Sequence, residues 1–242
     1  TFSTDTRNGR GLWFDAEFRL GVIIVVAVPV LLFLRHWWAA FDVGDERDLT
    51  AGIRAFWGAL FTGLSFLSTT GFVSADWSTA QGWSGLPVPG IILIGLALVG
   101  GGVATTAGGV KLLRVFALYL NGKRELERLM HPHSVGRKGL SGGRIRREGA
   151  FIAWVSFMLF AITIAALTMV LGLLGVDLEP AIVLTIATLS NTGPLVQVAA
   201  TDPIPVAGMG WDIKTVLGLA MVLGRLELLA VIVMLTPDVW RN

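Results

Sequence analysis

The sequence predicts an all-α polytopic membrane protein that contains two copies of one helical unit. Its 242 residues are 54% hydrophobic and only 15% charged, and the mean hydropathy is +0.71. Soluble domains carry about 25% charged residues, so the composition excludes a disordered chain and argues against an ordinary soluble enzyme. Two short strings that contain Thr-Gly lie 122 residues apart, which indicates an internal duplication. The absence of cysteine excludes disulfides, Cys-ligated zinc, iron–sulfur clusters and thiol nucleophiles.

Four apolar segments are expected to cross the bilayer, because a spanning helix needs about 20 largely apolar residues. Phe151 to Val176 carries no formal charge and is the clearest of them. The first segment contains Pro29, where we expect a kink, and it extends to the Trp37-Trp38 pair, which is typical of a membrane interface. The four segments are Leu20 to Leu34, Pro87 to Asn121, Phe151 to Val176 and Val216 to Thr236.

Two further apolar segments are predicted to enter the membrane and turn back as re-entrant pore helices. Glu179 to Leu189 is about 16 Å long as a helix, roughly half of a bilayer, and Thr50 to Leu67 is longer but contains Arg54. Each runs into a polar string with glycine, and irregular backbone at this depth is tolerated only inside protein or along a water-filled path. The two strings are Ser68-Thr69-Thr70-Gly71-Phe72 and Ser190-Asn191-Thr192-Gly193-Pro194.

The Thr-Gly strings predict ion coordination. Backbone carbonyls can replace the hydration shell of a cation when the chain is extended and its oxygens point toward an axis. Glycine suits such a string because it adopts backbone angles that are closed to other residues. A glycine turn that caps a buried helix is the alternative, and the equivalent placement of the two strings argues against it. We therefore expect filter loops at 68–72 and 190–194, with a cation at Thr70, Gly71, Thr192 and Gly193.

The second predicted span is interrupted by five glycines between Gly100 and Gly109, and such a stretch would not hold a stiff helix. It does not match the Walker pattern, because Leu112 and not serine or threonine follows Lys111, so nucleotide binding is rejected. A flexible segment below a filter can act as a gate, and close packing of helices through small residues is the alternative. The predicted gate residues are Gly100, Gly101, Gly102, Thr105, Thr106, Gly108, Gly109, Lys111 and Arg225.

Arg225 is a charge in the middle of the last predicted span. Such a charge is costly and faces a cavity or a partner. Glu227 lies two positions on, about 200° around the helix, and so does not face it. The threonines and carbonyls of the interrupted span could supply the partner, which would make Arg225 a latch or an electrostatic barrier. A purely structural buried arginine is the alternative.

Basic residues define the expected cytoplasmic side. With four crossings and two dips, 14 of the 19 Lys and Arg residues share the side of both chain ends and the middle loop, and orientation follows this asymmetry. The opposite side is acidic and would concentrate cations near an entrance, or its acids are merely solvated. The loop from Gly122 to Glu148 is basic, as positive-inside loops are, or it contacts anionic lipid or a cytosolic partner. His131 and His133 have no carboxylate partner nearby in the sequence and do not predict a metal site.

Taken in order, these motifs resemble the Trk/Ktr/HKT superfamily of potassium transporters, and within it the bacterial TrkH-type subunits. The two strings resemble the third and fourth filters of the family, and Gly224-Arg225-Leu226-Glu227 resembles its last, arginine-bearing helix. Thr106 to Lys111 resembles its intramembrane gating loop. Two departures stand out. The family loop usually reads Gly-Ser-Thr where this chain has Ala104-Thr105-Thr106, and the fourth filter usually reads Gly-Pro-Gly-Leu-Gly where it has Gly193-Pro194-Leu195-Val196-Gln197.

The resemblance implies potassium uptake across the bacterial inner membrane through a single-file selectivity filter. It implies potassium-channel-like M1–P–M2 units (helix, pore helix with filter loop, helix), of which residues 1–121 would be the third and 149–242 the fourth, joined by the basic cytoplasmic loop 122–148. The chain is thus expected to be the C-terminal half of a longer subunit, one that forms a homodimer and binds a cytosolic nucleotide-binding regulatory ring. No enzymatic activity is expected, because HExxH and GxSxG motifs and paired intramembrane carboxylates are absent. No cofactor is expected, and the formal net charge of +2 is too small to suggest nucleic acid. Transport of sodium, less selective transport of monovalent cations, and a non-conducting assembly role are the alternatives.

Overall fold

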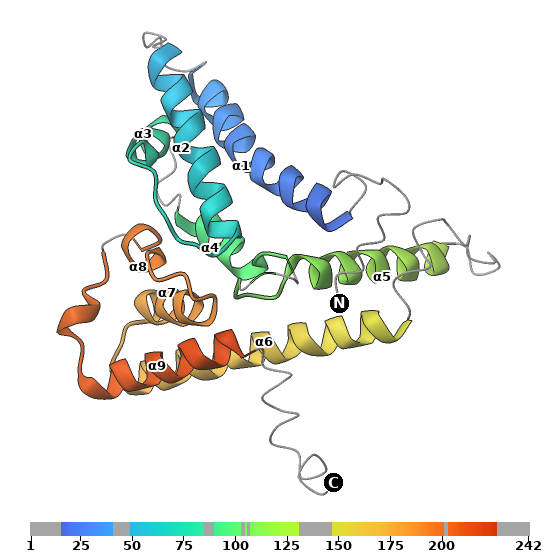
Figure 1. The fold of residues 1–242 in the computed structure, drawn as a ribbon, viewed down its shortest axis with the longest axis vertical. Coiled ribbons are helices and arrows are strands. Elements are labelled where there is room, and N and C mark those ends of the chain that lie inside the picture. Colours follow the sequence, from blue (N-terminus) through green and yellow to red (C-terminus); the bar gives the residue numbers. More distant parts are fainter. Residues whose placement is uncertain are drawn as a thin grey trace, which may run out of the picture.

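Helices are the only regular elements in the part of the chain that the computed structural model describes, residues 16–40, 49–84, 90–102, 105, 107–130, 147–200 and 203–226. Two groups of packed helices meet at α4 and at the break that follows it (Figure 1). The elements are α1 (Ala16–Ala40), α2 (Leu49–Leu67), α3 (Trp77–Ser84), α4 (Gly90–Val99), α5 (Leu112–Met130), α6 (Arg147–Leu173), α7 (Leu178–Leu189), α8 (Leu195–Val198), the 3-10 turn η2 (Val206–Gly208) and α9 (Trp211–Arg225).

The first group consists of α1, α2 and α3, each of which packs against the other two. Gly58 allows the closest approach, since a Cβ atom there would lie 2.6 Å from the carbonyl oxygen of Asp76, just before α3. Trp77 and Ala80 of α3 are buried. The sequence did not predict α3, because its eight residues, WSTAQGWS, are polar and short. Its position depends on contacts with α1 and α2 rather than on its own pattern.

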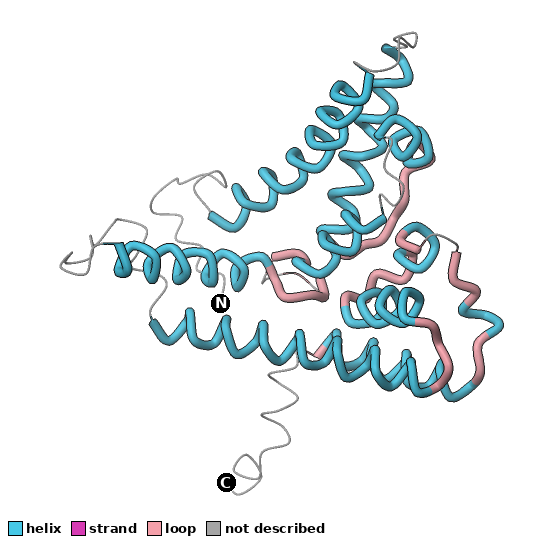
Figure 2. Tube along the Cα trace, turned by 180° about the vertical axis from the view of Figure 1, so that it is seen from behind, coloured by secondary structure: helices cyan, strands magenta, loops and turns pink. Residues whose placement is uncertain are grey.

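The second group is built on α6. Helices α5 and α7 pack along α6, and α9 packs against α7 and α6 (Figures 1 and 2). Gly224 of α9 allows close packing on the end of α7, because a Cβ atom there would lie 2.8 Å from the carbonyl carbon of Leu189. The end of α7, where the second string begins, is therefore packed against α9, while α7 also contacts α6.

Helix α4 joins the two groups through contacts with α2, α7 and α8. A Cβ atom at Gly90 would lie 2.9 Å from the carbonyl oxygen of Ala199, so α4 starts directly on the backbone that follows α8. One hydrophobic core runs through both groups and includes Phe66, Leu93, Leu184 and Leu195. The strings that follow α2 and α7 thus lie in one packed unit.

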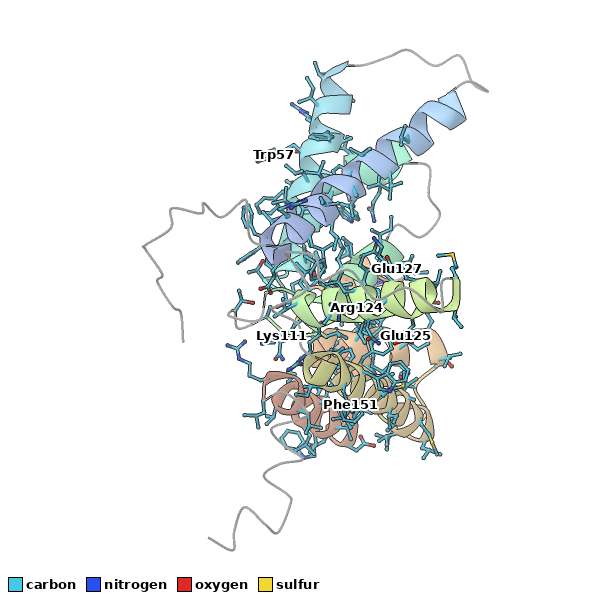
Figure 3. The ribbon with its side chains drawn as sticks, turned by 90° about the vertical axis from the view of Figure 1, so that its right-hand side faces the viewer. Trp57, Lys111, Arg124, Glu125, Glu127 and Phe151 are labelled. Carbon is cyan, nitrogen blue, oxygen red and sulfur yellow. The ribbon has the colours of Figure 1, made fainter. Side chains whose placement is uncertain are left out.

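Large apolar side chains cover the outside of α2 and α6. Ile53, Trp57 and Phe61 of α2 are exposed, and Trp57 is labelled on its helix in Figure 3. Exposed apolar area on this scale is typical of a surface that faces lipid or another protein. One helix segment among the described residues, Gly149–Leu173, is long and apolar enough to cross a bilayer. It begins just before the predicted third span, Phe151 to Val176, and ends inside that span.

Several predicted boundaries differ from those in the structure. Helix α5 continues to Met130, so residues 122–130 of the predicted loop are helical; Lys, Arg, Glu and Leu are strong helix formers, and Arg124, Glu125 and Glu127 lie along this helix (Figure 3). Helix α1, which contains Pro29, starts at Ala16 and not at Leu20. Helix α9 starts at Trp211, five residues before the predicted last span, and the part of that span after Leu226 lies outside the described residues.

Candidate functional site

The first string leaves α2 through a Schellman turn. The amide of Thr70 donates to the carbonyl of Ser65 (2.9 Å), and the amide of Thr69 donates to the carbonyl of Phe66 (3.2 Å), which is the pattern that closes many helices. Thr69 has a φ angle of 55°, a left-handed conformation that glycine usually occupies at this position and that costs other residues about 1–2 kcal/mol. Surrounding contacts, not local preference, therefore hold Thr69 in place.

The second string leaves α7 in the same way. The amide of Thr192 donates to the carbonyl of Ala187 (2.8 Å), the amide of Asn191 donates to the carbonyl of Thr188 (3.1 Å), and the φ angle of Asn191 is 56°. Every residue in these bonds lies 122 positions after its counterpart in the first string. The two strings therefore begin with one backbone conformation, imposed by the same two hydrogen bonds.

The two strings touch at Gly71. Its φ angle is 79°, and a Cβ atom there would lie 2.9 Å from Cδ of Pro194 and 3.3 Å from Cγ2 of Thr192. No side chain fits at Gly71, since both the backbone angle and the neighbouring string oppose it. Figure 2 shows the two loop segments near each other between the helix groups. Gly193, by contrast, has no atom within 4 Å of such a Cβ position and no left-handed φ angle.

Hydroxyl groups stiffen the base of the first string. The hydroxyl of Thr70 donates to the carbonyl of Ser65 (3.0 Å) and lies 3.0 Å from the hydroxyl of Ser65 itself. The hydroxyl of Ser68 donates to the same carbonyl (3.1 Å). Phe72 points outward, with 70% of its side chain exposed. Sequence reasoning did not single out Ser65; its signal is a polar residue on the buried face of an otherwise apolar helix.

The glycine-rich segment folds back on α4 and forms a compact loop, called the intramembrane loop below because the family resemblance predicts it to lie within the membrane. Gly100 and Gly109 have φ angles of 71° and 80°, and Lys111 has one of 74°. The amide of Val110 donates to the carbonyl of Leu98 (3.0 Å), which closes the loop at its base. Lys111 is buried, its Nζ donates to the carbonyl of Thr105 (3.5 Å), and Figure 3 shows it beside the start of α5. Thr106 lies outside the described residues.

Gly108 connects this loop to both strings. Its amide donates to Oγ1 of Thr69 in the first string (3.2 Å). A Cβ atom at Gly108 would lie 2.5 Å from the carbonyl carbon of Ser190 at the start of the second string. The loop therefore lies directly under the turns from which both strings emerge.

Residues 1–240 match the family model described as TrkH, a cation transport protein. This chain belongs to the TrkH family. It is similar to the Trk system potassium uptake protein TrkH of Vibrio parahaemolyticus, with 32% identity over 95% of this chain and 44% of that protein. The Trk system potassium uptake protein TrkH of Escherichia coli K12 is 30% identical over 97% of this chain and 46% of that protein. The crystal structure of the potassium transporter TrkH from Vibrio parahaemolyticus superposes with a TM-score of 0.78 and 28% identity, covering 99% of this chain and 48% of that one.

The chain spans about half the length of the TrkH relatives that it matches. The family model that it matches is the family that its motifs resemble. The match extends over nearly the whole chain, so both strings and the intramembrane loop lie within it.

The end of α9, with Arg225, lies close to the same junction. Arg225 follows Gly224, whose Cα packs on the carbonyl of Leu189, the residue before the second string. The side-chain amide of Asn191 donates to the carbonyl of Met221 on the same helix (3.3 Å). Leu189, on which Gly224 packs, directly precedes Ser190, on which Gly108 packs. The side chain of Arg225 itself is exposed, so the alternative of a buried structural arginine is wrong.

Glu17 is a site residue that sequence reasoning missed. A Cβ atom at Gly102 would lie 3.1 Å from Oε1 of Glu17, so the first turn of α1 lies against the intramembrane loop. The signal was a carboxylate directly before an apolar span. Within the described part of the chain, no three His, Cys, Asp or Glu residues gather as a metal site would require.

Proposed function

We propose that the subunit containing this chain takes up potassium across the bacterial inner membrane. The relatives that the chain matches are named potassium uptake proteins. In this proposal the chain supplies two M1–P–M2 units, and its strings line the ion path with Thr70 and Gly71 on one side and Thr192 and Gly193 on the other. The contact of Gly71 with Pro194 and Thr192 carries the proposal, because it brings two equivalent filter-like turns to one point.

The intramembrane loop is the gate in this proposal. Gly100 and Gly109 adopt left-handed backbone angles that favour glycine, and Gly108 holds the loop against both strings. Lys111 and Arg225 stabilise the closed loop, Lys111 through the carbonyl of Thr105 and Arg225 from the end of α9. Movement of this segment would open the path below the strings.

The orientation and the partners follow from charge and family. The Lys and Arg residues of α5 and the following loop would lie in the cytoplasm, where positive charge gathers in membrane proteins. The full-length subunit would form a homodimer and bind a cytosolic nucleotide-binding ring at this face. The chain itself needs no cofactor, and potassium is its substrate.

Uptake by the full-length protein in proteoliposomes tests the proposal. We expect rubidium uptake well above that of protein-free vesicles, with potassium competing far more strongly than sodium. No uptake above the protein-free control would overturn transport, and equal competition by the two ions would overturn potassium preference.

A further inference from the structure

The first turns of α1 lie where the intramembrane loop joins α5. Helices α1 and α5 contact each other, and Figures 1 and 2 show the beginning of α1 beside α5. A Cβ atom at Gly21 of α1 would lie 3.4 Å from Cδ2 of Leu112, the first residue of α5. Glu17 lies four residues before Gly21 and therefore on the same face of the helix. This face brings Glu17 to the loop residues that precede Leu112.

The carboxylate of Glu17 lies on one end of a turn in the loop. A Cβ atom at Gly102 would lie 3.1 Å from Oε1 and 3.6 Å from Cδ of Glu17, and the absence of a side chain at position 102 leaves room for the carboxylate. The carbonyl of Gly102 accepts hydrogen bonds from the amide (3.0 Å) and the hydroxyl (2.6 Å) of Thr105. Glu17 thus contacts a turn that these two bonds close between residues 102 and 105.

An ammonium group contacts the other end of the same turn. Nζ of Lys111 donates to the carbonyl of Thr105 (3.5 Å), and the side chain of Lys111 is buried. A buried charge is costly unless opposite charge and hydrogen bonds compensate it. The half-buried carboxylate of Glu17 brings negative charge to this turn, and charges that are partly buried are screened less by solvent than exposed ones.

We propose that Glu17 is a positioning residue of the gate, an inference that rests on the function proposed above. Its carboxylate holds the turn 102–105 in the closed loop and offsets the charge of Lys111. Helix α1 then restrains the loop through Glu17, while Gly108 restrains it at the two strings. Displacement of the first turn of α1 releases one of these two restraints.

Hydrogen–deuterium exchange of the full-length protein tests the contact without a transport measurement. The amides of Thr105, Val110 and Leu112 donate to backbone carbonyls in the closed loop, so they exchange when the loop opens. Glu17→Gln keeps the size of the side chain and removes its charge. Exchange of the peptide 100–112 should become about two- to fivefold faster, and the peptide Leu178–Leu189 of α7 should keep its parent rate. The initial rate of rubidium uptake should rise by a similar factor.

Two further variants separate this contact from a general effect on α1. An acidic residue in the first turn also favours the helix dipole, and Glu17→Asp keeps that charge but is one methylene shorter. It loses the contact with Gly102 and should also speed exchange of the loop. Arg19→Gln is the control, because Arg19 is exposed and lies about 200° around the helix from Glu17; its loop should exchange at the parent rate.

A second background tests the compensation of Lys111. When Lys111→Met removes the buried charge, Glu17→Gln should change exchange of the loop less than it does in the parent protein, because the two charges no longer interact. An equal effect of Glu17→Gln in both backgrounds would overturn the compensation.

The other outcomes separate this inference from the proposed function. Unchanged loop exchange in Glu17→Gln overturns the contact, and so does parent-like exchange in Glu17→Asp beside faster exchange in Glu17→Gln, which would assign the effect to the helix end. Faster exchange in both variants without a change in uptake overturns the role of Glu17 in the gate. A parent protein without uptake overturns the proposed function, and the exchange rates still decide whether Glu17 holds the loop.

Discussion

Replacing Gly108 with alanine is expected to push the intramembrane loop away from the second string. A Cβ atom there would lie 2.5 Å from the carbonyl carbon and 2.7 Å from the Cα of Ser190, and backbone atoms cannot turn aside as a flexible side chain can. The shift also strains the bond from the Gly108 amide to Thr69. Overpacking of this kind costs about 1–3 kcal/mol. If the closed loop alone bears that cost, the ratio of open to closed protein rises by about 5- to 150-fold.

The assay is the initial rate of rubidium uptake per reconstituted full-length protein. Gly102→Ala is the matched control, because in the same loop its Cβ atom would meet first the end of the flexible Glu17 side chain, 3.1 Å away. We expect Gly108→Ala to raise uptake and Gly102→Ala to leave it near the parent rate. Equal uptake by both variants, with equal melting temperatures, would refute the close packing of the loop on Ser190. A folded Gly108→Ala protein with lower uptake would refute the gate.

The remaining predictions concern α9 and one turn. Gly224→Ala should destabilise the protein by about 1–3 kcal/mol, because its Cβ atom would lie 2.8 Å from the carbonyl carbon of Leu189; Gly218→Ala in the same helix meets nothing within 4 Å, and equal melting temperatures of the two variants would contradict the packing. Gly175→Ala places a side chain at a φ angle of 87° and should cost about 1–2 kcal/mol, seen as a lower melting temperature; an unchanged value would argue against that turn. Arg225→Ala should raise rubidium uptake by weakening the closed loop, and unaltered uptake would count against a latch.

Local chemistry was enough to predict where the helices before the strings end. Apolar segments that run into Ser-Thr-Thr-Gly and Ser-Asn-Thr-Gly cannot continue as stiff helices in lipid, and α2 and α7 end at Leu67 and Leu189. The glycine-rich break between α4 and α5 follows from the same reasoning. The left-handed residues were not predictable in this way, because propensity favours glycine at that position, and the structure has Thr69 and Asn191 there.

The assembly of the site depends on tertiary contacts that no local pattern encodes. Gly108 reaches Thr69 and Ser190 only because α4 contacts both α2 and α7. The turn after Gly193 depends on the burial of Leu195, and burial of one leucine cannot be read from its neighbours in the sequence. The filter motifs alone therefore predict symmetry, whereas the packing around them produces a difference.

In the proposed function, the position of Gly108 under both turns links ion occupancy to movement of the loop. Residues of the two turns also contact the loop, because Oγ1 of Thr69 accepts a hydrogen bond from the Gly108 amide and the backbone of Ser190 lies against Gly108. A cation that favours one arrangement of the strings would therefore also bias the loop. Linkage is reciprocal: opening the loop must change the affinity of the strings for their ion by the same factor. A protein built this way would sense the permeating ion with its gate, without a separate binding site for that purpose.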